Sequence, residues 1–208
     1  MMDPDRIMYN WRRMTPEDRA AALESRQSRH VSWHGPPHYE DESGLYLLTA
    51  ACYEHQPWIG VAPQRVAAFE AEWLETLREH CLAVFAWVVL PNHYHALLHA
   101  PHVAVLLTAV GQLHGRTSFR WNGEEACRGR QVWHRAVETA IKSEGHFWAS
   151  MNYVLHNAVR HGYAKCWQDW PYSNAAQYLQ EVGRAEAERH WREYPLLDYG
   201  LGWDPPEL

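Results

Sequence analysis

Two apolar runs of the chain are separated only by Pro91 and Asn92. The run CLAVFAWVVL is rich in β-branched and aromatic residues, and HYHALLHA follows directly after the Pro-Asn pair. Residues of these kinds favour strands, and proline followed by asparagine favours a turn. The two runs therefore predict a β-hairpin, and a hairpin is stable only when further strands or helices cover it.

Strand-like and helical segments alternate on both sides of this hairpin. LYLLTAAC predicts a first strand, and RVAAFEAEWLETLREH has the apolar spacing of an amphipathic helix. Helical spacing returns from residue 102 to about 120, VWHRAVETA predicts a short strand, and 143–161 predicts a long helix. This order is the split βαβ pattern. The predicted class is α+β, a ferredoxin-like antiparallel sheet with packed helices and a C-terminal helical segment.

Three regions are expected along the 208 residues. Residues 1–42 are a polar extension, in which TPEDRAAALESRQ predicts a short helix. Residues 43–175 form the main domain, and residues 176–208 form an acidic tail.

No run approaches the roughly 20 apolar residues of a membrane helix, and the start of the chain does not resemble a signal peptide. We therefore expect a cytoplasmic protein without a membrane partner. The four cysteines are widely spaced and predict neither a zinc knuckle nor a disulfide framework.

The pair His93 and His95 is the first candidate for chemistry. Side chains two apart on a strand point to the same face, so both imidazoles can reach one ion. An HxH pair is a weak signal by itself in a chain with 15 histidines, and hydrogen-bonded strand histidines are the alternative. Zinc would usually need a further His, Cys or carboxylate, whereas oxygen ligands and water would suit Mg²⁺ or Mn²⁺.

The second candidate is the pair Tyr153 and Asn157 in the predicted long helix. Residues four apart lie on one helical face, so a phenol and an amide oxygen can face the same ion. A tyrosine nucleophile needs a polarised phosphate and loss of its proton, because its ordinary pKa is about 10. A half-buried aromatic residue and a solvated amide are the alternative interpretation of this pair.

The distribution of charge points to a nucleic-acid face despite the net charge of −6, which argues against general affinity for phosphates. Residues 112–166 carry eight basic and four acidic side chains, whereas residues 167–208 carry three basic and eight acidic ones. Several of the 12 tryptophans lie in or beside the basic segment, where rings can stack on unpaired bases. The candidate DNA-binding residues are Arg116, Arg120, Arg128, Arg130 and Arg135.

Two blocks of the sequence resemble a known family. WVVLPNHYHALL looks like the HUH segment of the REP-associated tyrosine transposases, which are single-domain HUH tyrosine transposases similar to the TnpA proteins of insertion sequences. YVLHNAVRHGYAKCWQDWPYS is similar to the family's second block, in which Asn follows the catalytic Tyr by four residues. GRQVWHRAVETAI resembles the strand between them, so the resemblance covers about residues 45–175. One departure is Ala158, where the family generally has proline.

The resemblance implies a metal-dependent single-strand DNA endonuclease and strand transferase. His93 and His95 would bind Mg²⁺ or Mn²⁺, Asn157 would be the third protein ligand, and Tyr153 would attack a phosphate to form a 5′-phosphotyrosyl intermediate. The implied partner is single-stranded DNA next to a hairpin, that is, a palindromic element. The resemblance leaves a monomer and a homodimer open.

Three other hypotheses compete with this one. A domesticated relative would bind and process hairpin or REP DNA without transposition, and palindromes beside the gene would distinguish the two. A pure single-strand binding module needs no nucleophile, and a zinc hydrolase needs a third well-spaced ligand.

His134, Glu138 and His156 are weaker candidates for groups that orient ligands. We expect ordinary polar roles for His99, His102, His114, His146 and His161.

Overall fold

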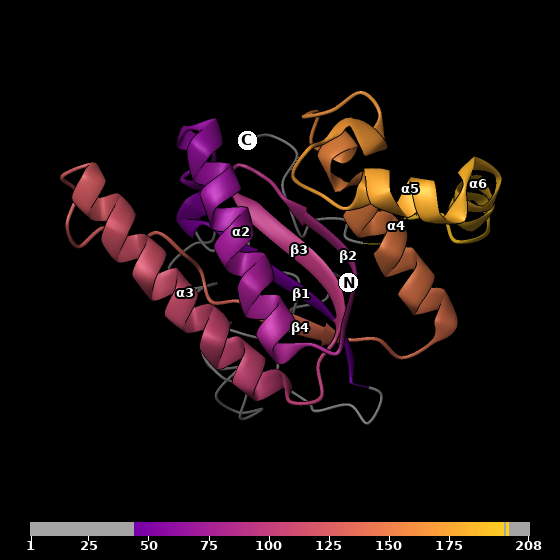
Figure 1. The fold of residues 1–208 in the computed structure, drawn as a ribbon, viewed down its shortest axis with the longest axis horizontal. Helices are drawn as coiled ribbons and strands as arrows, with labels where there is room; N and C mark the ends of the chain where they lie inside the picture. The colour runs from indigo at the N-terminus through magenta and orange to yellow at the C-terminus, as the bar shows by residue number, and fades with distance from the viewer. Residues whose placement is uncertain (1–43, 198, 200–208) are drawn as a thin grey trace, which may run out of the picture.

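A four-stranded antiparallel sheet lies between two layers of helices in the computed structural model, which describes residues 44–197 and 199 (Figure 1). The strands run in the order β2-β3-β1-β4 and are β1 (Leu45–Ala51), β2 (Ala83–Val89), β3 (His93–His99) and β4 (Val137–Ala140). The helices are α2 (Pro63–His80), α3 (Val103–Glu124), α4 (Glu144–Arg160), α5 (Ala175–Val182) and α6 (Arg184–Glu193), with single turns η2 (Tyr53–His55), η3 (Ile59–Val61) and η4 (Trp167–Asp169). The predicted α+β class and split βαβ order are confirmed.

The β2–β3 hairpin forms where the sequence predicted it. The backbone N–H of Leu90 donates to the carbonyl of His93 at 2.8 Å across the Pro91–Asn92 turn. The predicted strand in VWHRAVETA is shorter than expected, because only Val137–Ala140 pairs with β1, while Trp133 makes a single isolated bridge to Cys52.

Alternation along β3 divides its side chains between the two helical layers. Tyr94, Ala96 and Leu98 belong to the core under α2 and α3, whereas Leu97 belongs to the core under α4. His93 and His95 share the parity of Leu97, so their side chains point to the α4 face. Both faces of the strand are buried, and the hairpin therefore places two imidazoles between the sheet and α4.

The α2–α3 layer is packed with aromatic rings. Trp73 lies 4.5 Å from Tyr94 between ring centroids, and His114 stacks on Trp133 at 4.2 Å with nearly parallel planes. The Tyr94 hydroxyl lies 3.0 Å from His114 Nε2. Burial lowers the pKa of His114 to about 3, so the imidazole is a neutral member of this core at physiological pH.

The helices after residue 174 pack against α4. Trp148 of α4 stacks on His190 of α6 at 3.8 Å, and His156 stacks on Trp191 at 3.7 Å. This acidic region carries no sequence motif that predicts the packing, because its aromatic contacts join residues that are distant in sequence. The short helix predicted within 1–42 lies outside the described residues.

The segment just before α5 covers the free edge of β2. The N–H of Val89 donates to the carbonyl of Tyr172 at 2.8 Å, and Asn174 accepts from the N–H of Trp87 at 2.9 Å through Oδ1. Trp170 Nε1 donates to the carbonyl of Val89 at 2.9 Å. The segment 170–174 therefore protects an edge strand, which would otherwise expose unpaired backbone groups. Among the described helices, none is long and apolar enough to span a membrane.

The buried imidazole of His114 predicts loss of stability in acid. The unfolded chain takes up this proton near pH 6.5 and the folded protein only near pH 3, so lowering the pH through that window favours unfolding. The slope from this one group is up to about 1.4 kcal/mol per pH unit. We expect His114→Gln to reduce the slope of the free energy of unfolding against pH between pH 6 and 4. The reduction should correspond to the uptake of about one proton fewer on unfolding. An unchanged slope, equal to that of the exposed variant His102→Gln, would contradict this account.

Candidate active site

Four polar side chains from β3 and α4 meet between the sheet and α4. His93 Nε2 lies 3.0 Å from Asn157 Oδ1, and the Tyr153 hydroxyl lies 3.4 Å from His95 Nε2. The two imidazole rings are 5.1 Å apart between centroids. All four side chains are at most 1% exposed. The strand and helix spacings predicted two pairs, and the fold brings the pairs together from positions about 60 residues apart.

The Nδ1 atom of each of these two histidines lies within hydrogen-bonding distance of a neighbouring side chain. Thr49 is the β1 partner of His95 in the sheet register, and its hydroxyl lies 2.8 Å from His95 Nδ1. Asn92 Oδ1 lies 2.7 Å from His93 Nδ1, and Asn92 Nδ2 donates to the carbonyl of His55 at 3.1 Å. Both Nδ1 atoms are therefore engaged, which leaves both Nε2 atoms facing the α4 residues. Sequence reasoning missed Thr49, because only the β1–β3 register reveals it.

The donor atoms fit a divalent cation with an oxygen-rich shell. Asn157 directs its amide oxygen at His93, while its Nδ2 is buried and has no hydrogen-bond partner within the described residues. Buried amide N–H groups are normally hydrogen-bonded. The oxygen and nitrogen of an amide have nearly the same shape, so Asn157 can offer His93 Nε2 either an oxygen or an N–H donor. Two imidazole nitrogens and an amide oxygen leave room for water and phosphate oxygens, as Mg²⁺ and Mn²⁺ prefer. In residues 44–197 and 199, no group of three or more His, Cys, Asp or Glu could hold a metal.

The Tyr153 ring is covered by Tyr199, which follows α6. The two rings are 5.7 Å apart between centroids and nearly perpendicular. The Tyr199 hydroxyl lies 2.5 Å from Ser150 Oγ and 3.1 Å from His146 Nε2, so α4 itself holds the covering ring. Burial raises the pKa of Tyr199, and the hydrogen bond with Ser150 opposes that shift. Arg160 donates to the carbonyl of Tyr199 at 3.2 Å, and its guanidinium lies 5.6 Å from the Tyr153 ring centroid.

Comparison with known proteins gives the same family as the sequence blocks. A REP-associated tyrosine transposase of Escherichia coli is 29% identical over 137 residues, which are 62% of this chain and 73% of that protein. A protein of Haemophilus influenzae assigned to the same family is 23% identical over 143 residues, 64% of this chain and 80% of the relative. The chain is thus similar to two REP-associated tyrosine transposases over about two thirds of its length. No protein-family model matches it.

A solved structure has the same fold. A REP-associated tyrosine transposase bound to a REP hairpin superposes with a TM-score of 0.54 at 20% sequence identity, covering 69% of this chain and 84% of that one. The predicted HUH fold is thereby confirmed. The departure from the transposase pattern at Ala158 leaves α4 intact, because the helix continues to Arg160 and Ala158 is buried at 1% exposure.

Two of the arginines proposed for DNA binding are engaged by carboxylates. Arg120 of α3 forms an ion pair with Glu72 at 2.7 Å. Arg130 forms an ion pair with Glu125 at 2.6 Å and lies over the Trp58 ring at 3.9 Å. Their positive charge is partly offset within the protein, so the excess of arginine in this segment overstates the charge offered to a ligand.

The other three arginines are exposed. Arg116 lies on α3, Arg128 lies 4.1 Å from the centroid of the exposed Phe119 ring, and Arg135 precedes β4. The α3 helix lies on the opposite side of the sheet from α4 (Figure 1). The structure therefore does not gather the five predicted arginines around His93 and His95.

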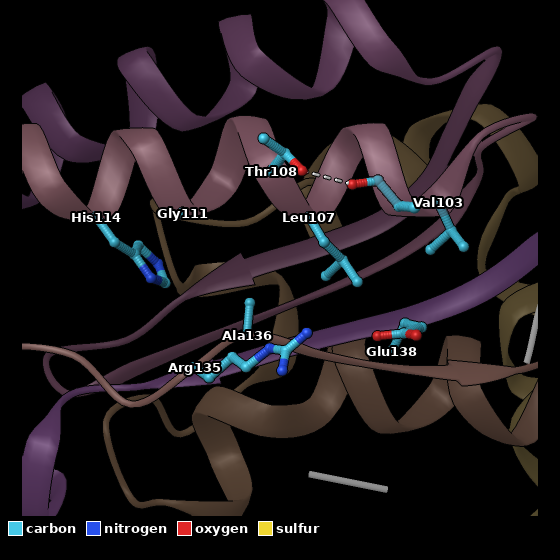
Figure 2. Close-up of a pocket in the computed structure, with 9 residues that line it drawn as sticks. Val103, Leu107, Thr108, Gly111, His114, Arg135, Ala136 and Glu138 are labelled. Carbon is cyan, nitrogen blue, oxygen red and sulfur yellow. Dashed lines mark hydrogen bonds between the residues drawn. The ribbon is translucent and has the colours of Figure 1, made fainter. Parts of the chain in front are cut away.

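A groove of about 680 Å³ lies between α3 and β4, separate from the histidine site. Figure 2 shows that Val103, Leu107 and Thr108 line it from the helix while Arg135 and Glu138 line it from the strand side. Glu138 thus belongs to the α2–α3 face and does not point to His93 or His95. The Arg135 guanidinium is the exposed charge of the groove.

Three further histidines have positions that the sequence did not reveal. His161, just after α4, packs edge-on against His93 at 4.8 Å between centroids. His134 accepts from the N–H of Glu54 at 3.2 Å, and His156 lies among the aromatic rings that dock α6. Burial lowers the pKa of His156 to about 4. Of these, only His161 contacts a residue of the candidate site, and its i,i+4 spacing from Asn157 was the available signal.

The covering contact predicts that Tyr153 resists chemical modification. We expect nitration of Tyr153, followed by peptide mass spectrometry, to be slow in the native protein and faster in Tyr199→Ala, because that variant removes the ring and both of its hydroxyl contacts. Tyr172→Phe, which removes the hydroxyl of a partly buried tyrosine that donates to the carbonyl of Pro63, is the control. Equal rates in Tyr199→Ala and the native protein would contradict the proposed cover.

Proposed function

We propose that this protein is a metal-dependent single-strand DNA endonuclease and strand transferase that cleaves DNA next to a hairpin. The observation that carries the proposal is the meeting of His93, His95, Asn157 and Tyr153 in one buried cluster on the HUH fold. The transposase relatives supply the class of substrate, and one of them is bound to a REP hairpin. A binding module would have no use for a phenol held against one histidine of such a pair.

The proposed reaction uses Tyr153 as the nucleophile. Its phenolic oxygen forms a bond to the scissile phosphorus as the bond from phosphorus to the 3′ oxygen breaks. The products are a 5′-phosphotyrosyl link and a free 3′ hydroxyl, and the phenolic proton is in effect transferred to the leaving oxygen. A second 3′ hydroxyl can reverse the step on another strand, which makes the enzyme a strand transferase.

The residues around the phenol would bind and orient the phosphate. Mg²⁺ or Mn²⁺ held by His93, His95 and Asn157 would withdraw charge from the phosphate oxygens. Arg160, already near the Tyr153 ring, would add a fixed positive charge at the same place. Packing of α4 on the sheet holds Tyr153 and Asn157 four residues apart on one face, so the nucleophile and the ligand keep a constant separation.

A covalent protein–DNA adduct is the decisive prediction. Native protein with Mn²⁺ and a hairpin carrying a single-stranded flank should give a shifted band on a denaturing gel, with labelled DNA on the Tyr153 peptide. Tyr153→Phe keeps the ring and its contacts but lacks the nucleophilic oxygen, so adduct and cleavage should both disappear while hairpin binding remains.

Two controls decide between mechanisms for the adduct. Chelation should abolish it, and Mn²⁺ or Mg²⁺ should restore it; restoration by Zn²⁺ alone would favour a hydrolase. Tyr163→Phe should cleave as the native protein does, because Tyr163 lies after α4. Labelled DNA on Tyr163 or on the buried Tyr94 would refute the assignment of the nucleophile.

The α3 arginines predict a graded effect on salt-dependent hairpin binding. Arg116→Ala should reduce the slope of log affinity against log salt by about 0.9, the value for one lost phosphate contact. Arg120→Ala, four residues further along the same helix, should reduce it less, because Glu72 offsets its charge. If Arg116→Ala leaves the slope of the native protein unchanged in fluorescence anisotropy titrations, the DNA lies on another surface.

A further inference from the structure

We propose that Asn92 is a positioning residue for the proposed metal site, which fixes His93 in the tautomer that carries its proton on Nδ1. This inference rests on the proposed function for its consequence, but its structural part concerns the protein alone. Asn92 is buried, at 4% exposure, in the turn between β2 and β3, and it touches His93 through its side chain.

The orientation of the Asn92 amide follows from its other contact. Asn92 Nδ2 lies 3.1 Å from the carbonyl oxygen of His55, and a carbonyl can only accept. The nitrogen of the amide must therefore face His55, and the oxygen must face His93 Nδ1 at 2.7 Å. An amide oxygen can only accept as well, so His93 Nδ1 is the donor.

A neutral imidazole with its proton on Nδ1 has a lone pair on Nε2. This lone pair faces the Asn157 amide, whose Oδ1 lies 3.0 Å from His93 Nε2. The Asn157 Nδ2 group has no partner within the described residues. An Asn157 amide turned over would donate Nδ2–H to this lone pair, and a cation would bind the lone pair together with the amide oxygen. Asn92 thus prepares His93 to act as a ligand.

The turn that carries Asn92 is itself fixed to the loop after β1. The N–H of Cys52 donates to the carbonyl of Asn92 at 2.7 Å, and the N–H of Gly60 donates to the carbonyl of Pro91 at 2.9 Å. A Cβ atom on Gly60 would come within 2.4 Å of the Pro91 Cβ, so the close approach requires glycine. The His55 carbonyl is therefore held where it can orient the amide.

The first measurement is made on metal-free native protein. Two-bond ¹H–¹⁵N correlation spectra of ¹⁵N-histidine-labelled protein distinguish the two neutral tautomers, and His93→Gln identifies the His93 signals. We expect His93 to carry its proton on Nδ1. Dominance of the Nε2-protonated form would overturn the proposal without the need for any variant of Asn92.

The second measurement compares Mn²⁺ affinities by electron paramagnetic resonance of free Mn²⁺. Asn92→Leu, of similar size but without polar atoms, should bind Mn²⁺ about 10–100-fold more weakly, as is typical when a group that orients a ligand is lost. Asn92→Asp keeps an acceptor for Nδ1–H and should recover most of the affinity. Equal affinity in Asn92→Leu and the native protein would overturn the proposal.

Asn174→Leu is the matched control. Asn174 also uses one amide to donate and accept, with the carbonyl of Phe85 at 3.0 Å and the N–H of Trp87 at 2.9 Å, and neither of these partners is a histidine. It should lower the unfolding midpoint without weakening Mn²⁺ binding. Equal loss of affinity in both leucine variants would reduce the role of Asn92 to general stability and refute the proposal.

Failure of the proposed function is distinguishable from failure of this inference. Absence of Mn²⁺ binding by the native protein would refute the metal site of the proposed enzyme, while the tautomer spectra would still decide whether Asn92 orients His93. Binding that is lost in His93→Gln but kept in Asn92→Leu would support the enzyme and refute the positioning role.

Discussion

The pairing of β1 with β3 is the constraint on which the candidate site depends. It runs in register from Leu45 opposite His99 to Ala51 opposite His93, and both strands are buried on both faces. A slip of one residue would turn both histidines of the HxH pair into the aromatic core and turn Tyr94 towards α4. The same register places the hydroxyl of Thr49 beside His95. Correct pairing of two central strands therefore sets which atoms can meet α4.

The parts of the site that sequence could predict are those with a local period. Two residues apart on a strand and four apart on a helix place His93 with His95 and Tyr153 with Asn157. The contact between those pairs depends on how α4 packs on the sheet, and no spacing encodes it. The family resemblance supplied that link. The supporting contacts of Thr49 and the cover by Tyr199 were out of reach, because they join segments that are distant in sequence.

The number of basic and acidic residues in a segment was a poor guide to the positive charge that the folded protein offers to a ligand. The basic segment 112–166 contains an arginine excess, yet Arg120 and Arg130 face carboxylates, and one of these, Glu72, comes from α2. Counting residues along a segment cannot detect a neutralising partner from another helix. The fold itself was more predictable, because the alternation of strand and helix patterns is local and the order of elements limits the topologies that a single sheet can adopt.

The burial of the Tyr153 phenol beneath Tyr199 would limit the rate of the proposed reaction. Tyr153 is 0% exposed in the conformation described, so in the proposed reaction attack on an external phosphate would proceed only from the fraction of molecules in which the cover has opened. Each 1.4 kcal/mol by which the closed state is favoured lowers that fraction about tenfold. Substitutions at Ser150, whose hydroxyl lies 2.5 Å from the Tyr199 hydroxyl, would then alter turnover of the proposed enzyme through a conformational equilibrium while the reacting atoms stay the same.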